Sequence, residues 1–292
     1  MILGLYRLFL RTIHIMFKRY LPLLLILTLA IACKDSGNSS GNSSSINEPA
    51  TDDAPAAISY TVLNATPHDT NSYTEGFLFH DGKLYESSGA PEDDPNTRSM
   101  FGEVDPATGK IAVKAELDRK TYFGEGITFL NGKVYQLTWT NKIGFIYDAK
   151  TFKKIGQFTI PGNEGWGMTT DGKDLILSDG TSNLIFVDPG TFKTIRSISV
   201  RDNNGPVGNI NELEYIKGSI YANVYQTTDV LRIDPASGKV TGKADFSRLD
   251  KEAKMKYSKA EYMNGIAYDS ANNKIYITGK LWPSIYEVRL ND

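Results

Sequence analysis

The chain has 292 residues, a formal net charge of −2, three histidines and one cysteine. Without an excess of positive charge it does not suit nucleic-acid binding, which needs a surface that neutralises phosphates. One cysteine excludes an internal disulfide, and His14, His68 and His80 are too few for a histidine-rich zinc site, so metal catalysis would have to use oxygen ligands. We expect no cofactor.

The first 33 residues have the pattern of an export leader. Lys18 and Arg19 precede an apolar run over residues 21–32, which ends at Cys33. As a helix this run would rise about 18 Å, short of the roughly 30 Å hydrocarbon core of a bilayer, so a membrane-spanning helix is the weaker interpretation. The pattern favours a leader that directs export.

The end of this leader predicts lipidation. Ala30 and Ala32 before Cys33 resemble the cleavage box of bacterial lipoproteins. We therefore expect an exported lipoprotein, anchored to the membrane through Cys33 in the bacterial envelope, in the periplasm or at the outer membrane. The alternative is a plain secretory signal with an unmodified thiol. Met16 is a second possible start, because residues 16–19 already form the basic beginning of a leader.

Residues 34–57 are rich in glycine, serine and asparagine and too polar to bury a core, so they predict a flexible linker. Residues 58–292 remain for the folded part. An exported domain of this size without disulfides must be held by packing alone, which favours a large closed architecture.

Five similar strand openings recur along this folded part, spaced 41 to 52 residues apart. They are Glu75-Gly-Phe-Leu-Phe79, Glu125-Gly-Ile-Thr-Phe129, Trp166-Gly-Met-Thr-Thr170, Glu212-Leu-Glu-Tyr215 and Asn264-Gly-Ile-Ala-Tyr268. A turn and a second strand follow each opening, with Asp-Gly or Asn-Gly at several of the turns, and these dipeptides favour tight hairpins. A third strand runs into an Asp-x-x-(Thr/Ser)-x-Lys turn at 105–110, 148–153, 188–193 and 234–239.

This period is typical of four-stranded propeller blades, so the sequence predicts an all-β, five-bladed β-propeller. The fifth unit is about one strand short, and an N-terminal strand over Ile58–Leu63 is expected to complete it and close the ring. We expect one short helix, over Ser247–Lys259. Six blades with one degenerate copy is the alternative, for which too few residues remain.

The openings of the inner strands form the mouth of a propeller's channel, and here they are unusually polar or aromatic. A single glutamate beside a glycine is often only a solvated turn residue, and a single tryptophan is often a packing residue. Convergence of five openings on one rim favours a ligand pocket instead. The residues concerned are Glu75, Glu125, Trp166, Asn211 with Glu212, and Asn264, surrounded by Tyr73, Phe123, Trp139, Tyr225 and Trp282.

Several strings at these positions resemble the plant-type glutaminyl-peptide cyclotransferases, and together they span residues 60–290. They include Tyr73-Thr-Glu-Gly76, Tyr122-Phe-Gly-Glu-Gly126, Gly165-Trp-Gly167, Asn211-Glu-Leu-Glu-Tyr215 and Thr278-Gly-Lys-Leu-Trp-Pro283. The resemblance implies a five-bladed propeller that closes the N-terminal glutamine of peptides or proteins into pyroglutamate and releases ammonia, without a metal. We expect it to act as a monomer.

The resemblance also implies roles for individual residues. Glu125 would be the general acid and base, with Asn211 hydrogen-bonding the substrate's amide or α-amine and Lys280 steadying a carbonyl oxygen as charge develops. The expected substrate-binding residues are Tyr73, Glu75, Phe123, Trp139, Trp166, Tyr225 and Asn264.

Two positions depart from the family pattern, which often has glutamine at Glu75 and tryptophan at Tyr225. Glu75 is expected to pair with the substrate's ammonium. Tyr225 keeps an aromatic wall and adds a hydroxyl group, so these two positions bear on substrate preference rather than on the acid–base step.

Two other functions are compatible with the residues. One is a gluconolactonase-like, metal-dependent hydrolase that holds a hard cation through Glu75, Asn211 and Asn264. The other is a propeller that binds a peptide N-terminus or a sugar without turnover.

Overall fold

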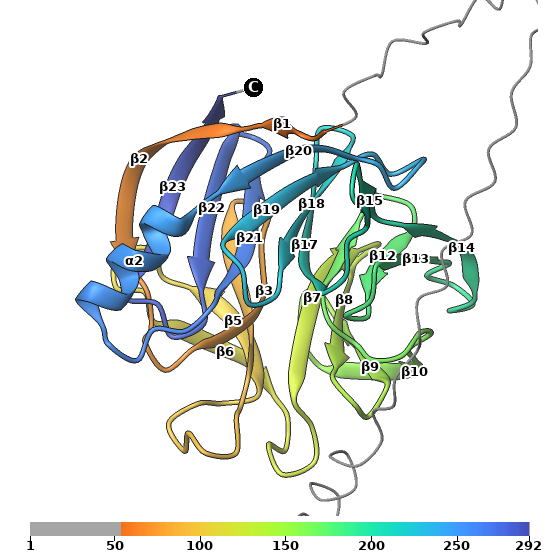
Figure 1. Ribbon diagram of the computed structural model, residues 1–292. Coiled ribbons are helices and arrows are strands. Elements are labelled where there is room, and N and C mark those ends of the chain that lie inside the picture. The colour runs from red at the N-terminus through yellow and green to blue at the C-terminus, as the bar shows by residue number, and fades with distance from the viewer. Residues whose placement is uncertain (1–53, 292) are drawn as a thin grey trace, which may run out of the picture. The chain divides into compact units, whose positions relative to one another are not determined.

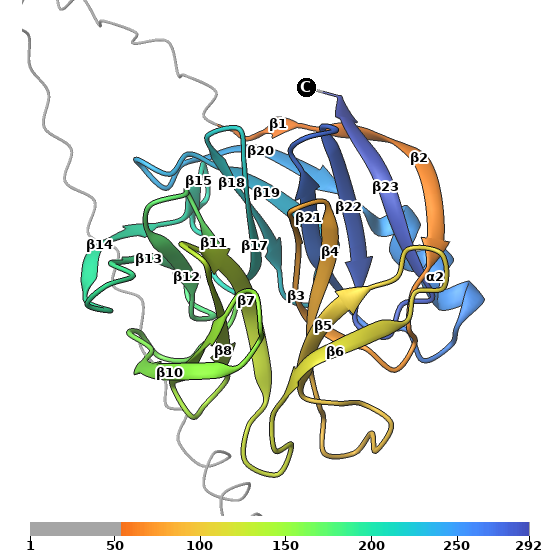
Figure 2. The same cartoon turned by 180° about the vertical axis from the view of Figure 1, so that it is seen from behind.

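The computed structural model describes residues 54–291, and their regular structure is almost entirely β. Four-stranded antiparallel sheets form the blades (Figures 1 and 2). Blade 1 contains β3 (Tyr73–His80), β4 (Lys83–Gly89), β5 (Met100–Val104) and β6 (Ile111–Glu116). Blade 2 contains β7 (Gly124–Leu130), β8 (Lys133–Thr138), β9 (Ile143–Asp148) and β10 (Lys154–Thr159). Blade 3 contains β11 (Met168–Thr170), β12 (Leu175–Ser178), β13 (Asn183–Val187) and β14 (Thr194–Ser199).

The last two blades follow the same order. Blade 4 contains β17 (Ile210–Ile216), β18 (Ser219–Val224), β19 (Asp229–Ile233) and β20 (Val240–Asp245), and blade 5 contains β21 (Met263–Asp269), β22 (Lys274–Gly279) and β23 (Ser284–Asn291). The first strand of each blade contacts the first strand of the next in the cycle β3, β7, β11, β17, β21 and back to β3. These innermost strands therefore surround one axis, which confirms the predicted five-bladed propeller.

A strand from the N-terminal side completes blade 5, as predicted. β2 (Ser59–Pro67) pairs antiparallel with β23, from Ser59 opposite Asn291 to Pro67 opposite Ser284. A second closure was not predicted: β1 (Ala56–Ala57) pairs parallel with β20. β1 falls within the segment expected to be linker, so strand pairing begins before residue 58. The predicted leader, Cys33 and residues 34–53 of the predicted linker lie outside the described residues.

Two smaller elements connect the blades. A short hairpin of β15 (Arg201–Asp202) and β16 (Gly205–Pro206) precedes blade 4. The expected helix is α2 (Ser247–Lys256), which ends three residues earlier than predicted because Tyr257 has extended backbone angles. Asp245 accepts hydrogen bonds from the backbone nitrogen and hydroxyl of Ser247 at its start. No helix in the described part of the chain is long and apolar enough to cross a membrane.

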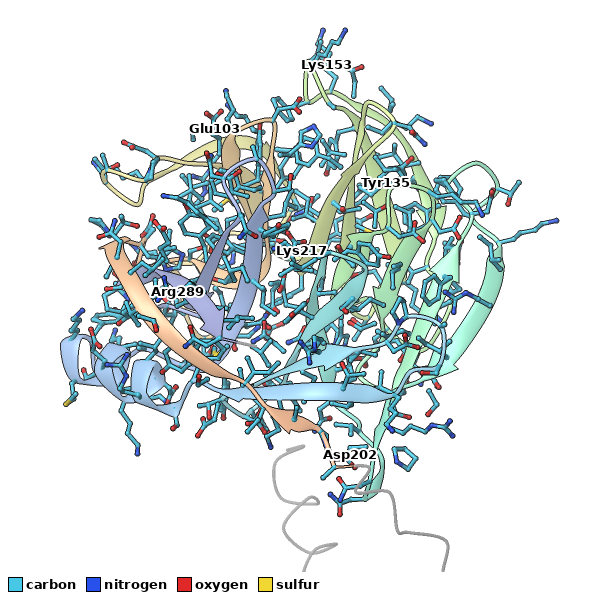
Figure 3. All side chains as sticks on the ribbon, turned by 90° about the horizontal axis from the view of Figure 1, so that it is seen from above. Glu103, Tyr135, Lys153, Asp202, Lys217 and Arg289 are labelled. Carbon is cyan, nitrogen blue, oxygen red and sulfur yellow. The ribbon has the colours of Figure 1, made fainter. Side chains whose placement is uncertain are left out.

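The recurring Asp-x-x-(Thr/Ser)-x-Lys segments form one kind of turn. In the copy that begins at Asp148, the carboxylate accepts hydrogen bonds from the backbone nitrogen and hydroxyl of Thr151, and the Asp148 nitrogen donates to the Lys153 carbonyl. These bonds lower the pKa of Asp148 because they stabilise the charged form. The turns lie at the periphery of the ring, as the labelled Lys153 shows (Figure 3).

A β-bulge interrupts the inner strand of four blades at the predicted site residue. Two residues of the inner strand face one residue of its partner at Glu125 with Gly126, at Asn211 with Glu212 and at Asn264 with Gly265, and one extra residue, Glu75, is inserted in blade 1. In blade 3 the nitrogen of Trp166 and the carbonyl of Gly167 both bond Ser178, which gives the same arrangement. Bulges re-aim side chains and are common beside active sites.

The bulges separate polar residues from core residues within each strand. In each blade, an apolar side chain lies two positions after the site residue (Glu75, Glu125, Trp166, Asn211 or Asn264). Each of these apolar side chains belongs to a different hydrophobic cluster. These side chains are Phe77, Ile127, Met168, Leu213 and Ile266, and all are at most 2% exposed. The packing between blades thus fixes the strand positions that carry the site.

Glycine follows the site residue because the neighbouring blade approaches closely. A Cβ atom on Gly126 would lie 2.5 Å from the nitrogen of Met168, and one on Gly167 would lie 2.0 Å from the carbonyl oxygen of Asn211. Blade 4 has Glu212 in place of this glycine. Its carboxyl group accepts hydrogen bonds from the nitrogens of Phe77 (3.2 Å) and Ile266 (2.9 Å), on the inner strands of blades 1 and 5.

Candidate active site

A pocket of about 420 Å³ opens at the end of the ring where the inner strands begin. We call it the mouth pocket. The loops over 90–99 and 117–123, at the lower edge of Figures 1 and 2, form part of its wall. Nine of the ten predicted site residues line it: Tyr73, Glu75, Phe123, Glu125, Trp139, Trp166, Asn211, Tyr225 and Lys280. The structure thus brings together residues from all five blades and from loops between them.

Two carboxyl groups and one ammonium form the polar centre of the mouth pocket. Glu75, Glu125 and Lys280 are each at most 5% exposed. Lys280 Nζ contacts Glu75 Oε1 directly, and Glu75 and Glu125 share a hydrogen bond. The expectation that Glu75 awaits the substrate's ammonium is therefore modified, because Lys280 already occupies that carboxylate.

This arrangement favours the protonated form of Glu125. Burial and then the negative charge of Glu75 raise the pKa of Glu125 well above its ordinary value. Burial also raises the pKa of Glu75, but the ammonium of Lys280 acts in the opposite direction. Two adjacent carboxyl groups cannot both ionise cheaply, so they share one proton, and the cation beside Glu75 leaves that proton on Glu125.

The two asparagines have different positions. Asn211 lines the pocket, and its buried side-chain oxygen has no hydrogen-bond donor near it among the described residues. A buried acceptor without a partner is costly, so this oxygen suits an N–H donor of a ligand. Asn264 does not line the pocket. Its amide nitrogen donates to the Thr74 carbonyl (2.9 Å) and to Glu75 Oε2 (3.2 Å), so it positions Glu75 instead.

Aromatic rings form the walls, in two groups of edge-to-face contacts. Phe123 lies between Tyr73 and Trp139, with centroid distances of 6.0 and 5.8 Å. Tyr225 lies 5.5 Å from Trp166. Trp139 is 41% exposed, as suits a residue at the rim. Such walls exclude water and give a flat, apolar surface for the aliphatic part of a ligand.

Trp282 is a correction to the sequence analysis, which expected all three tryptophans at the rim. Its side chain is fully buried in the cluster between blades 4 and 5, and its indole nitrogen donates to the Glu261 carbonyl. Adjacent Leu281 has a positive φ of 58°, which turns the chain so that Lys280 faces the pocket while Trp282 faces the core. Residue type alone did not distinguish these two environments.

Sequence reasoning also missed a buried ion pair behind Lys280. His68 contacts Glu86 at 2.9 Å and the Trp282 carbonyl at 2.7 Å, while Glu86 also accepts hydrogen bonds from Ser72 and Thr74. Burial disfavours the charged imidazole, but Glu86 outweighs it and raises the pKa of His68. This network ties the loop that carries Lys280 to the start of β3. A lone histidine in a loop gave no signal of it.

Arg119 was missed as well, although it shapes the pocket entrance. Its guanidinium donates to the backbone carbonyls of four residues in the neighbouring loop, which are Pro91, Asp94, Pro95 and Thr97. Pro91 and Arg119 both line the mouth pocket. One arginine thus holds a loop that has no regular structure of its own.

Fold and site together define a five-bladed propeller enzyme whose aromatic pocket holds a buried carboxyl group with a raised pKa, an arrangement suited to acid–base catalysis on a small polar group. A family model described as glutamine cyclotransferase matches residues 29–290. The chain belongs to the glutamine cyclotransferase family.

Two relatives agree with this assignment. A glutaminyl-peptide cyclotransferase of Arabidopsis thaliana is 38% identical over 231 residues, which cover 78% of this chain and 70% of the relative. The crystal structure of Myxococcus xanthus glutaminyl cyclase is 32% identical, with a TM-score of 0.74 over 81% of this chain and 98% of that one.

Glu75→Gln tests the shared proton. Removing the negative charge beside Glu125 lowers the pKa of Glu125, because that charge is one of the two main causes of its elevation. We expect the acidic limb of the kcat/KM profile to move to lower pH. The check is the pH profile of cyclisation for both proteins. An acidic limb at the same pH in both would show that the two carboxyl groups are not coupled.

Proposed function

We propose that the mouth pocket binds peptides or proteins with an N-terminal glutamine and converts this residue to pyroglutamate with release of ammonia. The chain is thereby an aminoacyltransferase, as its family and relatives indicate. The observation that carries the proposal is a buried carboxyl group with a raised pKa, Glu125, in the same pocket as the unpartnered oxygen of Asn211.

The reaction needs one group that both takes and returns protons. Ionised Glu125 accepts a proton from the substrate's α-ammonium, and the neutral amine then attacks the γ-carbonyl carbon. Protonated Glu125 gives its proton to the departing amide nitrogen and then accepts one from the attacking nitrogen, and the C–N bond to ammonia breaks. The proton that remains on Glu125 leaves with the product as ammonium, which restores the ionised carboxylate. Because burial raises the pKa of Glu125, it lies closer to the higher pKa of an α-amine than an ordinary carboxyl group does, which makes each proton transfer easier.

The other residues position the substrate and stabilise charge. Asn211 accepts a hydrogen bond from the substrate's α-amine. This bond orients the lone pair of the amine nitrogen toward the γ-carbonyl carbon of the substrate. Lys280 donates to the γ-carbonyl oxygen as negative charge develops, while Glu75 keeps the ammonium in place. The rings of Trp139, Trp166 and Phe123 confine the side chain to a folded conformation and exclude the water that would hydrolyse the amide.

Turnover of a Gln-initiated dipeptide tests the function. We expect the purified domain to release ammonia and to yield a product lighter by one ammonia, while the same dipeptide with an acetylated amine stays unchanged because it lacks the nucleophile. EDTA is expected to have no effect. Binding without ammonia release would support the non-catalytic propeller, and loss of all activity in EDTA would support the metal-dependent hydrolase.

The contacts of the Glu75 carboxylate argue against the metal-dependent alternative, because its oxygens are already bound to other groups of the protein. Its two oxygens face the ammonium of Lys280 and the amide nitrogen of Asn264, both of which carry positive partial or full charge. A cation held through Glu75, Asn211 and Asn264 would have to displace both groups. Among residues 54–291 no cluster of three or more histidine, cysteine or acidic side chains suits a metal.

We also propose that the enzyme is a monomeric lipoprotein of the bacterial envelope, anchored through Cys33. The basic leader, the short apolar run and the small residues before this cysteine support the proposal. We expect the full chain to partition into detergent and the Cys33→Ser variant to lose this property. Equal partitioning of the two would leave a plain secretory signal as the explanation.

A further inference from the structure

Glu164 is the residue through which the two aromatic walls of the mouth pocket are joined. A single oxygen, Oε2, accepts hydrogen bonds from the indole nitrogens of Trp139 (2.6 Å) and Trp166 (2.8 Å). These tryptophans belong to different blades: Trp139 follows β8, and Trp166 precedes β11. Both line the pocket and Glu164 does not. Glu164 therefore acts from behind the walls.

The two bonds connect two series of rings. On one side, Trp139 contacts Phe123, which contacts Tyr73. On the other side, Trp166 contacts Tyr225, which contacts Tyr262 at 5.4 Å. The two series contain six aromatic rings, and all of them except Tyr262 line the pocket. Glu164 joins the two series at the tryptophans, which have no direct ring contact with each other.

A second carboxylate completes this arrangement at the far end. The hydroxyl of Tyr73 donates to Glu261 (3.0 Å), the residue that directly precedes Tyr262. The rings and the two carboxylates make a closed belt around the mouth pocket, which we call the aromatic belt: Tyr73, Phe123, Trp139, Glu164, Trp166, Tyr225, Tyr262 and Glu261. Glu164 accepts hydrogen bonds from two ring N–H groups, and Glu261 accepts one from the Tyr73 hydroxyl and is joined to Tyr262 through the backbone. Such bonds are stronger when the acceptor is charged.

We propose that Glu164 is a positioning residue of this enzyme, which sets the spacing of Trp139 and Trp166 and so the width of the slot that receives the glutamine side chain. The proposal rests on the proposed function for the identity of the substrate. The hydrogen bonds themselves do not depend on it. An indole N–H at a pocket wall needs an acceptor, and here one atom satisfies two of them, so the two rings cannot move independently.

Glu164 also acts on the polar centre at longer range. Its negative charge is one of the causes that raise the pKa of Glu125. Because a glutamine at this position keeps the acceptor oxygen but loses the charge, Glu164→Gln and Glu164→Ala separate the two effects.

The test compares wild type with both variants and uses two measurements. The chain has three tryptophans, and Trp282 is fully buried away from the site, so changes in tryptophan fluorescence report on Trp139 and Trp166. Glu164→Ala is expected to change the emission and to raise KM for a Gln-initiated dipeptide about tenfold, with kcat within about threefold of wild type, since the walls bind substrate and transition state alike.

Glu164→Gln is expected to keep the emission and KM of wild type while its acidic limb moves to lower pH. The proposal is overturned by Glu164→Ala with unchanged emission and KM, or by Glu164→Gln that behaves like Glu164→Ala. The emission arm remains decisive even if the protein turns over no substrate, so the failure of the proposed function can be told apart from the failure of this inference.

A double-mutant cycle gives a second route if Glu164→Ala is poorly folded. Trp139→Phe keeps an aromatic wall but removes one N–H donor. If Glu164 acts through the indole, its replacement in the Trp139→Phe background raises KM clearly less than in wild type. Equal effects in both backgrounds would contradict positioning through this bond. Glu103→Ala, at the periphery on β5, is the control for a lost surface carboxylate.

Discussion

Glu125→Gln is expected to lower kcat/KM for Gln-initiated peptides by about 10² to 10⁴-fold, the contribution of a well-placed general acid and base. The amide has nearly the shape of the carboxyl group and still fits beside Glu75, but it neither accepts the proton of the α-ammonium nor returns one to the leaving ammonia. Ammonia release measured over several pH values checks this. The melting temperature should stay within a few degrees of wild type.

The matched control is Glu103→Gln, which makes the same chemical change on β5 at the periphery, where the carboxylate contacts Lys83 and Lys114. It is expected to retain wild-type turnover. If Glu125→Gln retained it too, the proton transfer would have to run through another group, and the assignment of Glu125 as acid and base would be wrong.

Glu212→Ala is expected to reduce the free energy of unfolding by about 2–6 kcal/mol. The carboxyl group satisfies two buried backbone nitrogens, those of Phe77 and Ile266, and its removal leaves both without an acceptor. Each unsatisfied buried group costs about 1–3 kcal/mol. Urea unfolding followed by circular dichroism measures the loss.

Glu212→Gln is the informative comparison, because its one amide oxygen satisfies one of the two nitrogens. We expect a loss between that of Glu212→Ala and zero. An unfolding midpoint unchanged in Glu212→Ala would mean that the contacts between blades 1, 4 and 5 do not depend on this carboxyl group.

The repeat made the fold predictable from the sequence. Each blade repeats the same hairpins, so the period of the openings gave the blade number, and the missing strand in the last unit pointed to closure by residues near Ile58. The pairing of β1 with β20 gave no such signal, since Ala56 and Ala57 are two small residues at the end of a polar segment.

The sequence predicted which residues come together at the site. It did not predict the direction in which each side chain points. Asn211 and Glu212 are adjacent, yet only Asn211 lines the pocket, because the bulge in β17 turns Glu212 toward the neighbouring strands. Asn264 is behind Glu75 for a similar reason. Bulge geometry depends on pairing with the next strand and with the next blade, which residue identity does not encode locally.

Pairs far apart in the chain were the main omission. Glu75 meets Lys280, 205 residues later, and His68 meets the carbonyl of Trp282, 214 residues later. The sequence around each of these residues does not indicate its distant partner. Glu164 lies two residues from Trp166 and is closer to detection, but its bond to Trp139 depends on how blades 2 and 3 face each other.

The joining of β2 to β23 also governs how the chain reaches its native state. Asn291 pairs with residues at Ser59 and Thr61, up to 232 positions earlier, so the ring has no closed form until nearly the whole chain is available. Contacts of such high sequence separation slow folding. A chain that lacks β23 would leave the edges of both β22 and β2 without a pairing strand. Unpaired strand edges promote association with other chains. Because β2 is synthesised long before β23, β2 stays without its pairing strand until β23 has been made.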